Sequence, residues 1–217
     1  MAVGALWGTP THSVAMIQRL PSPLRRTLLL AGLAAATVPA RATRAITTEG
    51  ITFAGDIKLG STPLQLNGVG WRAVAWVRGY AAALYLPRKA ASETEVLQQA
   101  GAKRLRMHMV QDVDAGEFIK AFVKGVQRNT PAAEQARLGE RVAQFNGLVQ
   151  ALGTLRKNDI IDLDFIPGRG LVLSRNGAAR GTPVGGDDFY AALLRCFIGP
   201  RPADPDMKTG LLGGPVG

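Results

Sequence analysis

The sequence contains few of the residues from which most catalytic and metal sites are built. Its 217 residues include one cysteine, Cys196, and two histidines. A lone cysteine can form neither an internal disulfide nor a cluster of thiolate ligands, and its apolar helical surroundings predict a buried thiol. His108 lies inside a strand-like stretch, where a histidine is more often structural than catalytic. The sequence therefore predicts no metal site and no cofactor.

Acidic residues are missing from the first 45 residues, which contain five of the 26 basic side chains. The rest of the chain has 21 basic residues against 16 acidic ones, so the net charge falls from +10 to +5. Aromatic residues make up only 6% of the chain and few of them lie among the basic residues. This pattern predicts no nucleic-acid partner, because single-stranded sites need stacking aromatics and duplex sites need a concentrated basic patch.

A long hydrophobic run is absent as well. The apolar stretch 28–36 is too short to span a bilayer, which takes about 20 apolar residues. Arg25 and Arg26 precede it, and small residues follow it up to Ala42 and Ala45. A basic segment, a short apolar segment and small residues at the exit are the parts of a secretory signal.

We therefore predict a signal peptide over residues 1–45, with cleavage after Ala42 or Ala45, and one domain over residues 46–217. Met16 is an alternative start. The paired arginines leave general secretory and twin-arginine export both open. The mature protein is expected in the periplasm or secreted, with no integral membrane span.

The pattern of apolar residues predicts an α+β fold, with a large, mainly antiparallel sheet covered on one face by a layer of helices. Period-two alternation and turn residues predict strands; 3.6-residue periodicity and capping residues predict helices. The expected strands are a hairpin over 51–68, a strand-like stretch over 71–86, a half-exposed strand over 103–110 and a hairpin over 159–180. The expected helices are 92–101, 114–129, 131–152, 185–199 and 204–212.

Two other motifs resemble binding sites but are not expected to bind a ligand. Gly68-Val69-Gly70 precedes a strand, whereas a phosphate-binding loop precedes a helix, so no nucleotide site is predicted. Asp162 and Asp164 lie two residues apart in a strand and share one face of it. With no further oxygen ligands nearby, we expect both carboxylates to face solvent rather than to hold a cation.

The stretch 71–86 is unusual because it contains Arg72 and Tyr80 among β-formers and small apolar residues. A buried arginine is costly unless it is paired, so an anionic partner is expected. That partner is either the carboxylate of a ligand, with Tyr80 donating a second hydrogen bond, or an Asp or Glu of the chain itself. In the first case Val74, Trp76, Ala82 and Leu84 are expected to line the pocket of the hydrocarbon tail.

Four segments together resemble the bacterial chalcone-isomerase-like domain. They are LNGVGWRAVAWVRGYAAALYLP, KRLRMHMVQDVDAGEFIKAF, DIIDLDFIPGRGLVLSRNG and GDDFYAALLRCFIGPRPADPDMKTGLLG, in the same order and within residues 50–213. The resemblance implies an open-faced sandwich, in which a large antiparallel sheet packs against helices and a ligand cleft lies between the two layers.

The resemblance also implies roles for individual residues. Arg72 matches the arginine that stabilises the enolate in plant chalcone isomerases. Tyr80 replaces the threonine that polarises the ketone, and the plant tyrosine falls near Phe118, where no phenol is present. The pair of Arg72 and Tyr80 instead resembles the fatty-acid-binding branch of the fold, where it holds a carboxylate.

Three functions therefore stand as hypotheses. The first is an exported protein that binds a fatty acid or a flavonoid-like apolar anion through Arg72, Tyr80, Val74, Trp76 and Phe118. The second is an isomerase of the intramolecular-lyase type, with Arg72 and Tyr80 as its catalytic groups. The third is a non-catalytic interaction protein that keeps the fold and has lost the cleft.

Overall fold

The computed structural model describes residues 43–74 and 77–216. Nearly all of the expected signal peptide, residues 1–45, lies outside these ranges, so the signal stays a prediction. Within the described ranges, no helix is both long and apolar enough to cross a membrane.

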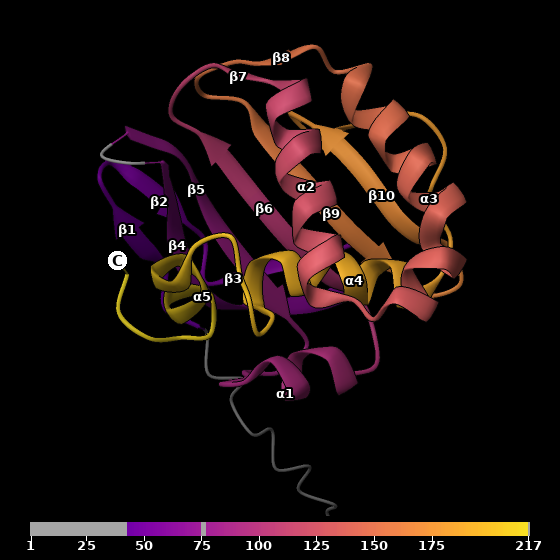
Figure 1. The fold of residues 1–217 in the computed structure, drawn as a ribbon. Helices are drawn as coiled ribbons and strands as arrows, with labels where there is room; N and C mark the ends of the chain where they lie inside the picture. The colour runs from indigo at the N-terminus through magenta and orange to yellow at the C-terminus, as the bar shows by residue number, and fades with distance from the viewer. Residues whose placement is uncertain (1–42, 75–76, 217) are drawn as a thin grey trace, which may run out of the picture. The chain divides into compact units, whose positions relative to one another are not determined.

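A seven-stranded sheet is the centre of the fold (Figure 1), with strand order β11-β10-β9-β6-β5-β4-β3. All neighbouring strands in it are antiparallel. Its strands are β3 (Asp56–Leu59), β4 (Thr62–Val74), β5 (Val77–Leu86), β6 (Lys103–Met109), β9 (Ile160–Ile166), β10 (Gly170–Arg175) and β11 (Ala178–Ala179). Two further strand pairs are β1 (Ile46–Thr48) with β2 (Ile51–Phe53), and β7 (Val113–Asp114) with β8 (Thr154–Leu155).

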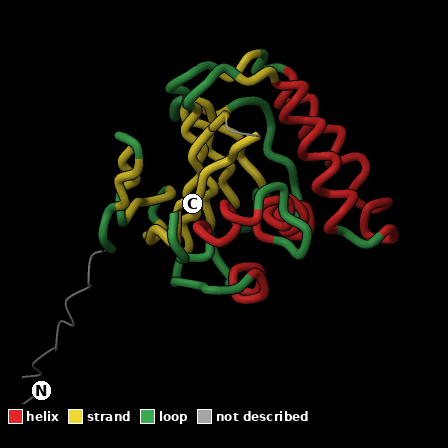
Figure 2. The backbone as a smooth tube through the Cα atoms, turned by 60° about the vertical axis from the view of Figure 1, so that its left-hand side comes forward, coloured by secondary structure: helices red, strands yellow, loops and turns green. Residues whose placement is uncertain are grey.

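The helices lie on one side of this sheet and the β1–β2 hairpin lies on the other (Figure 2). They are α1 (Glu93–Gln98), α2 (Ala115–Asn129), α3 (Ala132–Gln150), α4 (Asp187–Ile198) and α5 (Pro205–Leu211). The predicted α+β class, with helices over one face of a large antiparallel sheet, is confirmed.

Helix boundaries follow from residues that satisfy the first backbone N–H groups. The Ser92 hydroxyl accepts from the Glu95 amide at 3.3 Å, and α1 begins at Glu93, directly after Ser92. The Asp114 carboxylate accepts from the Gly116 amide at 2.8 Å at the start of α2. Pro131 separates α2 from α3, because proline lacks an N–H and disfavours helix in the residue before it.

Two apolar cores lie on the two faces of the sheet. The larger one fills the space under the helices, where the rings of Phe122, Phe145 and Phe189 pack against each other with centroids 4.8–6.2 Å apart. The smaller one lies under the β1–β2 hairpin and includes Phe53 and Trp71. Both faces of the β4–β5 half of the sheet are thus covered.

The single strand-like stretch expected over 71–86 is in fact two strands. β4 and β5 pair antiparallel, and residues 75–76 lie between them, outside the described ranges. Arg72 and Tyr80 are direct partners across this pair. The register shifts just after them, because Ala73 pairs with Arg78 and Gly79 is left over as a bulge. Arg72 and Tyr80 are therefore close because their strands fold back on each other.

The Gly68-Val69-Gly70 motif has a packing role. A Cβ atom at Gly68 would collide with the carbonyl oxygen of Gly210, and one at Gly70 would lie 2.7 Å from the Cα atom of Met207. Glycine is thus required on β4 because the backbone of α5 packs directly on it.

The expectation that Asp162 and Asp164 face solvent is wrong. Each side chain is at most 5% exposed, and each carboxylate meets an arginine of the neighbouring strand β6. Arg106 binds Asp162 through Nε and Nη2 at 2.7 and 2.8 Å, and Arg104 binds Asp164 in the same way at 2.6 and 2.7 Å. The hydrogen bond to Asp162 raises the pKa of Arg106 above its usual value. Both carboxylates are thus neutralised by arginines across the strand pair.

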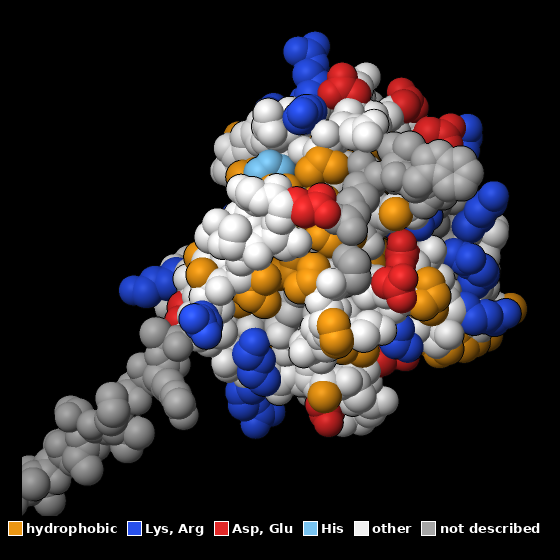
Figure 3. All heavy atoms as spheres, turned by 90° about the vertical axis from the view of Figure 1, so that its left-hand side faces the viewer, with side chains coloured by type: hydrophobic (Ala, Val, Ile, Leu, Met, Phe, Trp, Pro, Cys, Tyr) orange, Lys and Arg blue, Asp and Glu red, His pale blue; other side chains and the backbone are white. Residues whose placement is uncertain are grey.

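The face in Figure 3 is not uniformly basic. Lys and Arg side chains lie mainly around its edge, and hydrophobic side chains and some acidic ones lie in the middle.

Candidate functional site

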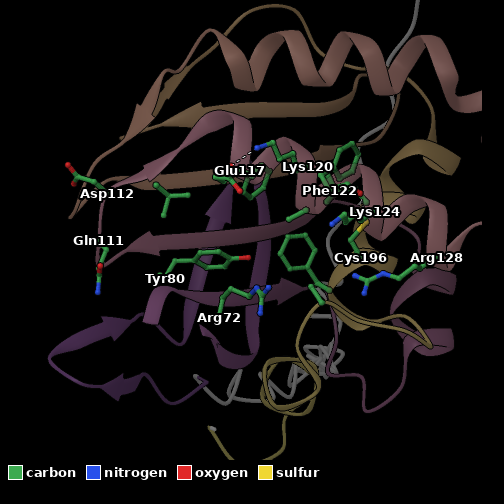
Figure 4. Close-up of a pocket in the computed structure, with 17 residues that line it drawn as sticks. Arg72, Tyr80, Gln111, Asp112, Glu117, Lys120, Phe122, Lys124, Arg128 and Cys196 are labelled. Atoms are coloured by element: carbon green, nitrogen blue, oxygen red, sulfur yellow. Dashed lines mark hydrogen bonds and ion pairs between the residues drawn. The ribbon is translucent and has the colours of Figure 1, made fainter. Parts of the chain in front are cut away.

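A pocket of about 610 Å³ lies between the sheet and the helices α2 and α4 (Figure 4). Pockets of this size commonly hold a small organic ligand. Its wall is formed by Arg72 of β4, Tyr80 of β5, the start and one side of α2, part of α4 and Ala203 in the segment before α5.

The interior of the pocket is mainly aromatic and aliphatic. Phe122, Leu193 and Phe197 are buried core residues that also face the pocket. Phe118 is partly buried and packs against the same core. Such a surface favours an apolar ligand, because each Å² of apolar area removed from water contributes about 25 cal/mol.

Arg72 brings a positive charge to the edge of this apolar interior. Its side chain is 24% exposed, and its Nη1 lies 3.5 Å from Oδ2 of Asp204 and donates to the Ala73 carbonyl at 2.6 Å. Its Nε and Nη2 groups make no hydrogen bond to the residues that the structure describes. Arg72 thus has an internal carboxylate, Asp204, near one nitrogen. It also keeps two nitrogens whose N–H groups can donate to the carboxylate of a ligand.

Tyr80 lies beside Arg72, and both polar ends point into the pocket (Figure 4). Its hydroxyl has no hydrogen-bond partner within the described part of the chain. Burial raises the pKa of Tyr80 well above its usual value, although the charge of Arg72 acts in the opposite direction. The phenol is thus protonated at neutral pH and can donate a hydrogen bond.

Three basic residues of α2, at intervals of four, lie at the rim of the pocket: Lys120, Lys124 and Arg128. That spacing places them on one side of the helix. Lys120 binds Glu117 at 2.7 Å, whereas Lys124 and Arg128 are exposed and have no carboxylate partner among the described residues. Asp112 and Glu117 also line the pocket, so its basic side chains outnumber its acidic ones by four to two, which favours the approach of an anion.

Two residues with reactive side chains do not supply catalytic chemistry here. Cys196 lines the pocket, but burial raises the pKa of its thiol to about 12, so almost none of it is the nucleophilic thiolate at neutral pH. His108 alternates along β6 with Met107 and Met109 of the helix-side core, so it points to the opposite face of the sheet. In the described ranges, no group of three His, Cys, Asp or Glu residues is arranged to hold a metal ion.

The structure brings together three of the five residues expected at the ligand site: Arg72, Tyr80 and Phe118. Trp76 lies outside the described residues, and so does the side chain of Val74.

Two further residues that were expected at the pocket wall, Ala82 and Leu84, are fully buried in the main core and do not line the pocket. They face the same side of the sheet but are covered by helices.

Sequence reasoning missed Asp204 and the basic side of α2. Asp204 is far from Arg72 along the chain, and no local signal predicts that the two meet. The spacing of Lys120, Lys124 and Arg128 was visible in the sequence, but the pocket beside it was not.

The comparisons with known proteins concern the fold and the family. The model of the chalcone isomerase-like family matches residues 45–213. A solved structure of a fatty-acid binding protein from Arabidopsis thaliana is similar, with a TM-score of 0.59 and 17% sequence identity. The similarity covers 78% of this chain and 96% of that one. No curated protein matches the chain. Since the match spans most of the sequence, and the sheet, helices and pocket described above accompany it, the chain belongs to the chalcone isomerase-like family.

Proposed function

We propose that this protein binds a fatty acid or a similar apolar carboxylate in the pocket between the sheet and α2 and α4. One observation carries the proposal: Arg72 and Tyr80, partners across β4 and β5, direct hydrogen-bond donors without partners into an otherwise largely apolar pocket. A guanidinium and a neutral phenol suit a carboxylate, because both donate and one is charged.

Three further features support this function. The aromatic and aliphatic interior suits a hydrocarbon tail, and Lys124 and Arg128 at the rim attract an anion. The similar structure from Arabidopsis thaliana is described as a fatty-acid binding protein. We also propose that the protein acts after export to the periplasm or the exterior, on the basis of the signal-like segment 1–45.

Replacement of Arg72 tests the proposal. We expect Arg72→Met to raise the Kd for dodecanoate tenfold to a hundredfold, since a hydrogen bond to a charged group is worth about 1.5–3 kcal/mol. Isothermal titration calorimetry below the micelle concentration measures it.

The matched control is Arg169→Met, which removes the same charge from an exposed turn outside the pocket wall. This control should bind as the wild type does. Equal affinities of the Arg72 variant and the wild type would remove the basis of the proposal.

Chalcone-isomerase chemistry is the second candidate, and the site favours it less. Asp204 lies 3.5 Å from Arg72 and weakens the positive charge that would stabilise an enolate. Tyr80, with its raised pKa, stays protonated and cannot serve as a ready base. We therefore expect chalcone loss, followed by absorbance at neutral pH, to proceed with turnover far below about 1 s⁻¹, the low end for ordinary enzymes. Turnover at or above that rate, abolished by Arg72→Met, would establish the isomerase instead.

A further inference from the structure

Asp204 links three parts of the structure through one carboxylate. Its Oδ1 accepts from the amides of Asp206 and Met207, both at 3.1 Å, and so caps the N-terminus of α5. Its Oδ2 accepts from the Ala73 amide of β4 at 3.3 Å and faces Nη1 of Arg72 at 3.5 Å. The position of this carboxylate is thus fixed by backbone groups, independently of Arg72.

The contact between Arg72 and Asp204 is loose. Strong ion pairs of arginine with carboxylate are bidentate, with N–O distances of about 2.7–2.9 Å. Arg104 and Asp164 of this protein show that geometry, at 2.6 and 2.7 Å. Arg72 instead offers Asp204 one nitrogen at 3.5 Å, and its Nε and Nη2 make no hydrogen bond to the described residues. A ligand carboxylate could therefore bind Arg72 while Asp204 remains in place.

From this arrangement we propose that Asp204 is a specificity-determining residue of the pocket, which acts through Arg72. It is the resident counter-ion of the guanidinium in the empty pocket, and it weakens the binding of carboxylates relative to uncharged polar heads such as alcohols. Two carboxylates that share one guanidinium repel each other, whereas an alcohol head meets no such repulsion. The inference rests on the proposed function, since it concerns ligands of the same pocket.

The variant Asp204→Asn tests it without removing the cap. Asparagine is as good an N-cap as aspartate: its one side-chain oxygen can still accept from the amides of Asp206 and Met207, whereas the Ala73 amide loses its acceptor. We expect this variant to bind dodecanoate roughly tenfold more tightly than the wild type, because one nearby negative charge is gone. Its affinity for 1-dodecanol should change by less than about twofold, as a neutral head does not sense that charge.

The control is Asp206→Asn, two residues along the same helix. It removes the same charge, and the Asp206 side chain is exposed and makes no bond to the described residues. A ratio of dodecanoate to 1-dodecanol affinity that rises in Asp204→Asn and stays unchanged in Asp206→Asn supports the inference. A purely structural role of Asp204 would alter both ligands alike, and thermal melts of the two variants record any loss of fold.

The outcomes separate this inference from the proposed function. If the wild type binds dodecanoate and Asp204→Asn binds it no more tightly than Asp206→Asn, the inference fails and the proposed function stands. If only Asp204→Asn binds dodecanoate, the inference is supported and the proposed function of the wild type fails. If neither the wild type nor Asp204→Asn binds it, both fail.

Discussion

Asp162→Ala should lower the free energy of unfolding by about 3–5 kcal/mol, the usual cost of removing one partner of a buried ion pair. Asp162 is 3% exposed and binds Arg106 through two hydrogen bonds at 2.7 and 2.8 Å, with Arg104 at 3.6 Å. Without this carboxylate, two arginines on the same face of the sheet would lose their shared counter-ion. Urea unfolding followed by circular dichroism measures the change.

The matched control is Glu117→Ala, which breaks an ion pair on the surface. Glu117 and Lys120 are 65% and 70% exposed, so the loss of their ion pair should cost far less than the loss of Asp162. The double variant Asp162→Leu with Arg106→Met should recover much of the lost stability, because it removes both charges rather than stranding one. If Asp162→Ala costs no more than Glu117→Ala, the cross-strand pairs do not stabilise the sheet.

The fold could be predicted to a large extent because its signals are local. The capping residues Ser92 and Asp114 and the break at Pro131 mark helix ends within a few residues of the sequence. The hairpin of β9 and β10 follows from alternation around a turn with glycines at 168 and 170. No proline or turn residue separates β4 from β5, since apolar residues continue through the connection. The boundary between these two strands was therefore missed.

The site could be predicted only in part, because its chemistry depends on contacts between distant residues. Arg72 and Tyr80 stood out as polar residues in an apolar strand, and the family resemblance gave them a role. What surrounds Arg72 depends on Asp204, which reaches it through the packing of α5 on β4. In the same way, Asp162 and Asp164 were expected to face solvent. The strand register that sets them opposite arginines cannot be predicted from the sequence of one strand.

Gly70→Ala should lower the free energy of unfolding by about 3 kcal/mol, at the upper end of the usual cost of overpacking. The added Cβ would meet three backbone atoms of Met207, of which Cα lies at 2.7 Å and the carbonyl carbon at 3.0 Å. Backbone cannot rotate away as a side-chain end can, so α5 has to move off β4. Unfolding in urea gives the change in stability.

A displaced α5 would also take Asp204 away from Arg72, since Asp204 caps that helix. Gly70→Ala should therefore bind dodecanoate differently from the wild type even where it remains folded.

The matched control is Gly139→Ala in the exposed interior of α3, where a Cβ would meet nothing within 4 Å. That replacement should raise stability by about 0.5–1 kcal/mol, because alanine loses less conformational freedom in a helix than glycine does. A loss of stability in Gly70→Ala together with a gain in Gly139→Ala would show that the close approach of α5 requires the glycine of β4. A Gly70→Ala protein as stable as the wild type would mean that α5 is not held against β4, and the fixed position of Asp204 would then have no support.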